Sequence, residues 1–388
     1  MKEKLLIVTH HLTIGGVQKS LISALKCFDY DKYDVTLYLR KNRTTLLPYI
    51  DKRVNVIINE AKTHYYRKPY AVCLQIKSAL YKILGKTEKM KACDKELADR
   101  MRVDSMEYEK NTYFKDKVFD KAVAYVQGYT VQFVDEYIRA KEKYMFFHTS
   151  TDEIHEVHEM ALPQMKKIAA LHDEQKELIK EWYKLDDEKI TIVENYVDRE
   201  TVIAQSSEYS VDRPEDRTVL CSCGRLSPVK GFDLAVECAK MLKEKNVNFF
   251  WHFVGDGPEK NNLSALIGKY ELQNHIQITG MKENPYPYMR ACDIYVQPSY
   301  EESWGLTIVE AQKLLKPVVS TATVGGKKLV NDKNGVVTEI SAESLADGII
   351  RLMSDEQLYK NIADYLENND NSDEENKFKE QWRKLLEE

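Results

Sequence analysis

Between Tyr295 and Ser320 the chain reads YVQPSYEESWGLTIVEAQKLLKPVVS, a succession of strand, loop, helix and strand. Residues 295–297 are expected to end a short buried strand, which Pro298 breaks. A helix is expected over residues 306–315, because apolar residues recur there at helical spacing. The pattern predicts one unit of a parallel α/β sheet, in which ligands bind outside the carboxyl ends of the strands.

The loop inside this stretch has the chemistry of a ligand site. Glu302 precedes the expected helix and Glu310 lies within it, so both carboxylates can face one ligand. The first turn of a helix presents unpaired N–H groups and partial positive charge, which suit a phosphate. Carboxylates accept hydrogen bonds from vicinal hydroxyl groups. A nucleoside diphosphate sugar has phosphate in the middle and polyols at both ends, and it fits this combination.

Composition narrows the class of protein. The 388 residues are 43% hydrophobic, which is enough for the buried cores of two to three domains. A net charge of −5 gives no general affinity for nucleic acid. The seven cysteines are scattered and odd in number, which argues against a disulfide framework or a metal site. No apolar run approaches the ~18 residues of a membrane-spanning helix, and the amino-terminal apolar segment is too short for a signal peptide. We therefore expect a cytoplasmic protein, with peripheral contact at the inner face of a membrane left open.

The chain is expected to contain two βα halves. A polar segment at residues 206–217 indicates a linker, and βα units begin afresh after it. We therefore predict a first domain over residues 1–198 and a second over residues 216–373. The last residues form a charged helix, about 374–388, whose apolar stripe needs a surface to cover. That stripe consists of Phe378, Trp382, Leu385 and Leu386.

A helical excursion is expected to interrupt the first domain at about residues 62–115. Its opening part, residues 62–91, carries eight lysine or arginine residues against the single acidic residue Glu88, with tyrosine and aliphatic residues between them. A basic, aromatic, amphipathic segment can lie on an anionic membrane surface. It can equally be a helix packed on the sheet with solvated lysines. Both interpretations stay open, whereas nucleic acid is disfavoured because the rest of the chain offers no matching basic face.

Other strand ends carry residues suited to phosphate or sugar. Gly15 and Gly16 precede an expected helix and would let the backbone approach a ligand closely, although a tight turn explains them equally well. His148 ends a strand of the first half. In the second half, Arg225 and Lys230 follow one strand and their charges would stabilise a diphosphate. Small-residue turns follow further strands there, at Gly255 among others.

The assembled pattern resembles the glycosyltransferases of family four, which have the GT-B fold. The likeness covers nearly the whole chain and is strongest at residues 224–231, 254–258 and 297–317. Its most specific motif is E-x7-E, formed by Glu302 and Glu310. The resemblance implies an α/β fold of two Rossmann-like domains that face each other across a cleft, with the terminal helix returning to the first domain.

The resemblance also implies roles for individual residues. Glu310 would bind the ribose of the donor nucleotide, Glu302 would lie by the donor sugar, and His148 would face the transferred sugar. The diphosphate would be held by the side chains of Arg225 and Lys230, by the N–H groups of Leu306 and Thr307, and by the glycine loops at Gly15, Gly16 and Gly255. The backbone at Met281 and Lys282 would meet the base.

The implied activity is transfer of a sugar from a nucleoside diphosphate sugar, with UDP favoured, to a hydroxyl of a glycan or lipid-linked oligosaccharide. The anomeric configuration would be retained, and no metal or other cofactor is expected. Ser303 and Trp304 replace the glycine and the aromatic residue usual after the first glutamate, and Leu315-Lys316 replaces a glycine. Lys327 and Lys328 stand where relatives carry an acidic residue, which affects donor or acceptor details. A sugar-nucleotide epimerase, a phosphorylase and a non-catalytic nucleotide-sugar-binding protein are the alternatives.

Overall fold

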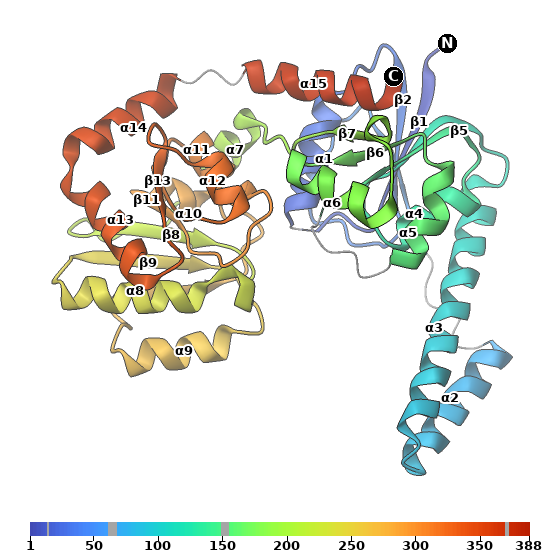
Figure 1. Ribbon diagram of the computed structural model, residues 1–388, viewed down its shortest axis with the longest axis horizontal. Helices are drawn as coiled ribbons and strands as arrows, with labels where there is room; N and C mark the ends of the chain where they lie inside the picture. Colours follow the sequence, from blue (N-terminus) through green and yellow to red (C-terminus); the bar gives the residue numbers. More distant parts are fainter. Residues whose placement is uncertain (14, 61–67, 149–154, 369–371) are drawn as a thin grey trace. The chain divides into compact units, whose positions relative to one another are not determined.

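The computed structural model describes residues 1–13, 15–60, 68–148, 155–368 and 372–388. The chain divides into two compact units (Figure 1). Unit 1 comprises Met1–Glu194 together with Lys379–Glu388, and unit 2 comprises Asn195–Phe378. Each unit is built around one sheet of parallel strands, so the expected α/β architecture of two Rossmann-like domains is confirmed.

Unit 1 contains a seven-stranded sheet in the order β3-β2-β1-β4-β5-β6-β7. The sequence order reverses between β1 and β4, and a crevice at such a switch point is where open α/β sheets bind ligands. The strands are β1 (Glu3–Thr9), β2 (Tyr33–Leu39), β3 (Asn55–Ile58), β4 (Phe119–Ala124), β5 (Ala140–Phe146), β6 (Lys167–Ala170) and β7 (Ile190–Ile192). The helices are α1 (Gly16–Cys27), α2 (Pro69–Ile83), α3 (Thr87–Glu109), α4 (Tyr129–Tyr137), α5 (His155–Ala161) and α6 (Asp173–Tyr183).

Unit 2 contains a six-stranded sheet in the order β10-β9-β8-β11-β12-β13. Its switch point lies between β8 and β11. The strands are β8 (Thr218–Cys223), β9 (Phe249–Val254), β10 (Ile276–Gly280), β11 (Ile294–Gln297), β12 (Val318–Thr321) and β13 (Gly335–Thr338). The helices are α7 (Arg199–Ser206), α8 (Phe232–Glu244), α9 (Lys260–Lys269), α10 (Tyr286–Ala291), α11 (Leu306–Lys313), α12 (Val324–Leu329), α13 (Ala342–Ser354) and α14 (Glu356–Asn368). The last helix, α15 (Ser372–Glu387), begins in unit 2 and continues into unit 1 from Lys379.

The boundary between the units falls a few residues before the one predicted from the sequence. Residues 195–198 were expected to close the first domain, but they belong to unit 2. The reason is aromatic and apolar packing: the Tyr196 ring stacks on Phe378 with centroids 5.3 Å apart, and Val197 joins the core beneath α10 and α11. The segment expected as a linker begins at the last residue of α7, and Val202 of this helix joins the same core.

The last ten residues of the chain pack within unit 1. The ring of Trp382 lies 4.9 Å from Phe28 and 5.0 Å from Phe146, measured between ring centroids. Leu385 and Leu386 are buried beside it, and the backbone oxygen of Leu386 accepts a hydrogen bond from Tyr144. The apolar stripe seen in the sequence is therefore buried, and it ties α15 to the sheet of unit 1.

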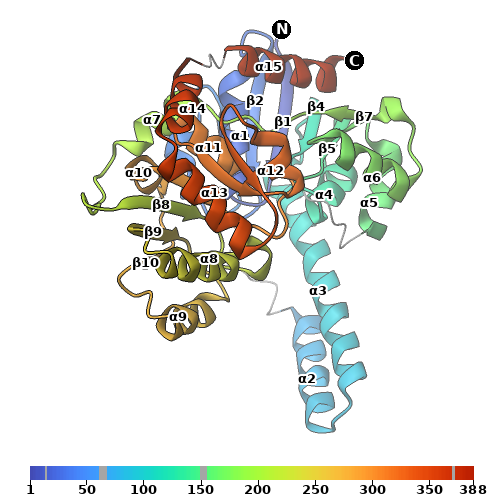
Figure 2. The ribbon, with the colours of Figure 1, turned by 60° about the vertical axis from the view of Figure 1, so that its left-hand side comes forward.

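The predicted helical excursion is a hairpin of α2 and α3 that extends away from the sheet of unit 1 (Figures 1 and 2). Its start, residues 61–67, lies outside the described residues. Lys68 pairs with Asp104 at 2.7 Å, and Ser78 donates a hydrogen bond to Asp94 at 2.6 Å, so polar contacts along its length join the two helices. Among the described residues of α2 and α3, Met106 near the end of α3 is the one that joins this core cluster of the unit. The interpretation as a helix packed on the sheet is therefore wrong for most of the excursion.

A buried ion pair fixes the base of this hairpin. Glu109, the last residue of α3, receives two hydrogen bonds from the guanidinium of Arg40, at 2.9 and 3.0 Å. The same carboxylate accepts hydrogen bonds from the hydroxyl groups of Tyr38 and Ser105. A bidentate, fully hydrogen-bonded pair of this kind defines one geometry, and it holds the end of α3 against β2.

Among the helices of the described residues, none combines the length and the apolar character needed to cross a membrane.

Candidate functional site

The unit 2 residues that the sequence placed around a diphosphate lie at the carboxyl edge of its sheet. The Lys230 ammonium lies 2.6 Å from Glu302 Oε2, and the two side chains are 28% and 13% exposed. Lys230 ends a short 3-10 turn after β8, whereas Glu302 lies in the loop after β11. The two strands flank the switch point, so this pair occupies the place at which parallel sheets bind ligands.

Backbone contacts hold these two loops together. The carbonyl oxygen of Val229 accepts hydrogen bonds from the N–H groups of Tyr300 and Glu301, at 2.9 and 3.2 Å. Gly231 follows with φ of +63°, and a Cβ at this position would lie 2.0 Å from the carbonyl oxygen of Pro298. Only glycine fits both the left-handed backbone and the close approach. The position of the lysine relative to the glutamate is therefore set by the backbone.

Gln297 orients the carboxylate of Glu302. Its Nε2 donates to Glu302 Oε2 at 3.3 Å and to the Ser299 hydroxyl at 2.8 Å. Its Oε1 accepts hydrogen bonds from the hydroxyl groups of Tyr295, at 3.0 Å, and Thr307, at 2.9 Å. The sequence analysis missed this residue, although a polar side chain that ends an apolar strand beside the expected site was a usable signal.

The helix α11 brings Glu310 and a helix amino terminus to the same place. It begins after Gly305, and its first turn leaves the N–H groups of Leu306 and Thr307 without an intrahelical carbonyl partner. Glu310 is buried, with 1% of its surface exposed, and accepts a hydrogen bond from the Tyr286 hydroxyl at 2.9 Å. A carboxylate in this position is fixed in orientation, which suits recognition of a neighbouring hydroxyl group.

The remaining unit 2 candidates lie at the same edge of the sheet but do not touch this pair. Arg225 follows β8 with an exposed side chain, and no hydrogen bond or ion pair joins it to Lys230 or Glu302 within the described chain. Met281 and Lys282 follow β10, two strands away from β8, and the Lys282 ammonium lies 5.6 Å from the centre of the Tyr288 ring.

Close packing of two loops requires a glycine at position 255. A Cβ there would lie 1.8 Å from the carbonyl oxygen of Gly224, so a side chain would push apart the loops that follow β8 and β9. This requirement holds whether or not a ligand is present. The small-residue turn after β9 therefore does not by itself indicate phosphate binding.

Lys327 and Lys328, which stand where relatives carry an acidic residue, also lie at this edge of the unit 2 sheet. The Lys328 ammonium sits 4.5 Å from the centre of the Trp304 ring, in a cation–π contact. The N–H of Gly325, in the same helix α12, donates to the carbonyl oxygen of Glu302 at 2.8 Å. Two of the departures from the family pattern, Trp304 and Lys328, therefore contact each other.

His148 follows β5 of unit 1. Its Nε2 lies 2.8 Å from the carbonyl oxygen of Tyr125, and its ring stacks on Phe146 with centroids 5.6 Å apart. Because a carbonyl oxygen can only accept, Nε2 carries the ring proton. Burial lowers the pKa of His148 to about 4, so the ring is neutral near pH 7 and its Nδ1 has a lone pair. Within the part of the chain that the structure describes, this buried Nδ1 has no hydrogen-bond partner.

The glycine loop of unit 1 follows β1, the strand next to the switch point. Gly15 has extended backbone and caps α1, and Gly16 is exposed as the first residue of that helix. His10 of the same loop lies 3.4 Å from the Thr130 hydroxyl, measured from Nδ1. Burial, with Arg40 nearby, lowers the pKa of His10 to about 4. The three predicted residues of unit 1, Gly15, Gly16 and His148, thus all follow strands at the carboxyl edge of its sheet.

The described residues contain no group of three or more histidine, cysteine, aspartate or glutamate side chains that could hold a metal ion.

Comparison with known proteins relates part of the chain to a family of glycosyltransferases. Residues 205–369 match the family model "Glycosyl transferases group 1". We call these residues the group 1 domain. They contain the Lys230–Glu302 pair, Glu310 and the whole of the switch point of unit 2.

Part of the chain is also similar to a curated glycosyltransferase. The chain is 29% identical over 178 residues to the lipopolysaccharide core biosynthesis glycosyltransferase LpsE of Rhizobium meliloti, and the match covers 45% of this chain and 51% of that protein. The chain therefore spans about half the length of this relative.

Solved structures agree over the full length and bear on the fold. A glycosyltransferase from Rickettsia africae superposes with a TM-score of 0.67 at 21% identity, covering 100% of this chain and 99% of the other. The structure of HepE from Anabaena in complex with UDP and glucose superposes with a TM-score of 0.69 at 18% identity, covering 99% of each chain. The chain has the GT-B fold that the resemblance implied.

Proposed function

We propose that this chain is a glycosyltransferase that moves a sugar from a nucleoside diphosphate sugar to a hydroxyl group of a glycan or lipid-linked oligosaccharide, with retention of configuration. The observation that carries the proposal is the Lys230–Glu302 pair at the switch point of the group 1 domain, beside the amino terminus of α11. A cation, a helix terminus and two oriented carboxylates are complementary to a diphosphate with hydroxyl groups on either side.

Each residue has a role in this proposal. Lys230 and Arg225 bind the diphosphate together with the N–H groups of Leu306 and Thr307. Glu310 accepts hydrogen bonds from the ribose, and Glu302 accepts them from the donor sugar. Gly255 and the backbone at Met281 and Lys282 complete the unit 2 part of the donor site in this assignment. A phosphate contact of Gly15 and Gly16 in unit 1 stays a prediction from the sequence.

The difficult step is departure of the diphosphate. The bond between the anomeric carbon and the phosphate oxygen breaks, the acceptor oxygen bonds to that carbon, and the acceptor proton passes to the departing phosphate on the same face. Negative charge develops on the phosphate, so fixed cations and amide dipoles aimed there supply the largest stabilisation. In our proposal these groups act without a metal ion. His148, neutral and with a lone pair on Nδ1, would accept a hydrogen bond from a hydroxyl of the transferred sugar.

The relatives suggest the substrate classes. The structure of HepE holds UDP and glucose, which favours UDP as the nucleotide here, and the name of LpsE places that enzyme in lipopolysaccharide core biosynthesis. We therefore expect a UDP-sugar donor and an acceptor that belongs to a cell-surface glycan.

A panel of sugar nucleotides tests the proposal. Nucleotide release measured with and without a glycan acceptor should rise only when a matching donor and acceptor are both present. An epimerase would instead interconvert donor sugars without acceptor, and a binding protein would shift the melting temperature without releasing nucleotide. Either of those two results would contradict the proposed transfer.

A further inference from the structure

One face of α2 carries apolar side chains that are exposed in the described part of unit 1. Val72, Ile76, Leu80 and Ile83 recur at spacings of four, four and three residues, so they lie on one side of the helix. They are 43%, 64%, 52% and 82% exposed. The next residue, Leu84, is 54% exposed at the tip of the hairpin. These five residues form the outer apolar stripe.

This stripe is not the face that packs on α3. Ala71 and Leu74, which are 0% and 6% exposed, lie on the opposite side of α2. Ser78 also faces α3, because its hydroxyl bonds to Asp94. The helix is thus apolar on two sides, and α3 covers only one of them. A helix that is apolar on an uncovered side normally has a further surface to cover.

Lysines concentrate at the same end of the hairpin. Residues 77–91 contain five lysines and one acidic residue, Glu88. Glu88 pairs with Lys91 at 3.0 Å. Two lysines of α2, Lys77 and Lys82, and Lys86 in the turn that follows form no ion pair within the described chain. All three side chains are exposed.

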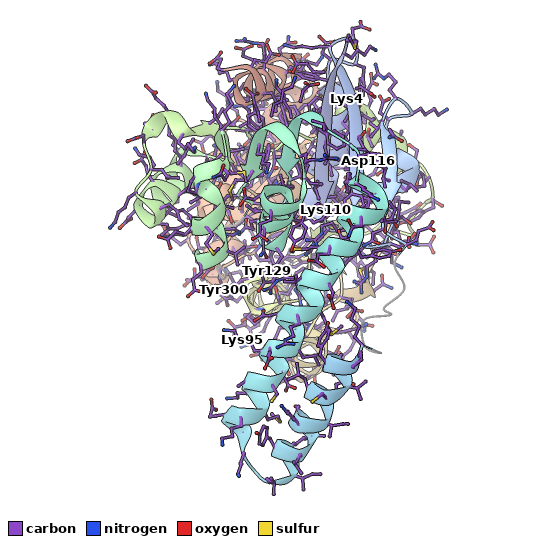
Figure 3. All side chains as sticks on the ribbon, turned by 90° about the vertical axis from the view of Figure 1, so that its right-hand side faces the viewer. Lys4, Lys95, Lys110, Asp116, Tyr129 and Tyr300 are labelled. Carbon is purple, nitrogen blue, oxygen red and sulfur yellow. The ribbon has the colours of Figure 1, made fainter. Side chains whose placement is uncertain are left out.

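The hairpin presents this end away from the body of unit 1. Figure 3 shows the tip of the α2–α3 hairpin beyond Lys95, and Lys110 near the sheet. Because α3 has 23 residues, it is about 35 Å long. The Arg40–Glu109 pair fixes its base, so the hairpin is a stiff extension whose tip carries exposed apolar and cationic groups.

We propose that the tip of the α2–α3 hairpin binds an anionic lipid surface. The outer apolar stripe would enter the boundary between head groups and acyl chains, while Lys77, Lys82 and Lys86 would lie among the lipid phosphates. An amphipathic helix binds such a surface through buried apolar area and attraction between its cations and anionic lipid. The occupant is a lipid surface because it supplies hydrocarbon and negative charge together. A second copy of the chain would bring an equally basic tip.

Sedimentation of the full chain with vesicles tests this inference. Vesicles of phosphatidylcholine alone are compared with vesicles containing phosphatidylglycerol at about 30%. The triple variant Lys77→Gln/Lys82→Gln/Lys86→Gln should lower the partition coefficient on the anionic vesicles on the order of a hundredfold, since each lysine contributes about fivefold. A matched triple variant in unit 2, Lys245→Gln/Lys269→Gln/Lys360→Gln, changes the net charge equally and should leave partitioning nearly unchanged.

The apolar stripe has its own variant. Ile76→Ser/Ile83→Ser should weaken binding about tenfold or more, whereas Ile203→Ser/Ile340→Ser, at exposed positions of unit 2, should not. The far-ultraviolet circular dichroism of each variant should match the parent chain, because all these side chains are exposed. Equal binding to both vesicle types, or equal partitioning of hairpin and control variants, would overturn the proposal. The proposal would also be overturned if the parent chain did not bind vesicles and instead formed a dimer in sedimentation velocity that the stripe variant dissociates.

Discussion

The ammonium of Lys230 lies 2.6 Å from Glu302 Oε2, although 72 positions separate the two residues in the chain. The contact joins the loops that follow β8 and β11, the two strands at the switch point of unit 2. A lysine held by one carboxylate retains further N–H donors for a phosphate. The pair therefore places a cation and a hydrogen-bond acceptor side by side before any substrate arrives.

Glu302 and its neighbour Glu301 provide a matched comparison. Glu302→Gln removes a charge-assisted acceptor for the donor sugar and should lower kcat/KM by about 30- to 150-fold, equivalent to about 2–3 kcal/mol. Glu301 is exposed, and Glu301→Gln should retain nearly full activity. Steady-state transfer kinetics measure both. Equal losses in the two variants would show that charge in the loop, not the position of Glu302, matters.

The diphosphate assignment is tested by two cations. Arg225→Ala and Lys230→Ala should each cost about 2–4 kcal/mol of transition-state stabilisation, because each removes a fixed donor from the departing phosphate. The loss should fall mainly on kcat. Lys245→Ala, a surface substitution in the same unit, serves as the control. Turnover close to normal in both site variants would rule these cations out as the diphosphate ligands.

The backbone at Gly231 should be intolerant of a side chain. Gly231→Ala places a Cβ 2.0 Å from the Pro298 carbonyl oxygen and adds the cost of a left-handed backbone, so the free energy of unfolding should fall by at least about 2 kcal/mol. Gly268 lies in α9, where the nearest atom to a new Cβ is 3.9 Å away. Gly268→Ala should therefore be neutral or stabilise by up to about 1 kcal/mol. Urea unfolding compares the two, and an unchanged midpoint for Gly231→Ala would refute the crowding.

The burial of His148 predicts that the free energy of unfolding depends on pH. The pKa of His148 is lowered to about 4 in the folded chain, below the ordinary value of 6.5. Below pH 6.5 the unfolded state binds a proton that the folded state does not, so stability is full above pH 6.5 and declines as the pH falls toward 4. The slope contributed by one such group is up to about 1.4 kcal/mol per pH unit. His148→Gln keeps a donor for the Tyr125 carbonyl and should show a correspondingly shallower decline in urea unfolding. Identical slopes would mean that the histidine does not titrate in this way.

Much of the architecture could be predicted because the strands are short apolar runs that end in glycine, proline or charge. Residues 294–297 followed by Pro298 are an example, and the structure ends β11 at Gln297. The end of α11 was predicted two residues too late, since Leu315 adopts a left-handed backbone with φ of +61°. Such a conformation at a leucine has no signature in the periodicity.

The site could be predicted only in outline. Glu302, Lys230 and Arg225 were identifiable as charges at strand ends, but spacing along the chain does not reveal that two of them form an ion pair. The hydrogen bonds of Gln297 and the contact of Tyr286 with Glu310 depend on loop geometry, which sequence patterns do not encode. The sequence did not decide the placement of the hairpin, because its lysines and apolar residues suit a helix packed on the sheet and a helix on a membrane surface equally.

A crystal of the chain soaked with UDP tests the central claim most directly. The account predicts that the diphosphate lies within hydrogen-bond distance of Arg225, Lys230 and the N–H groups of Leu306 and Thr307, with the ribose hydroxyl groups on Glu310. A nucleotide bound elsewhere on the chain, or a diphosphate that contacts neither cation, would contradict it.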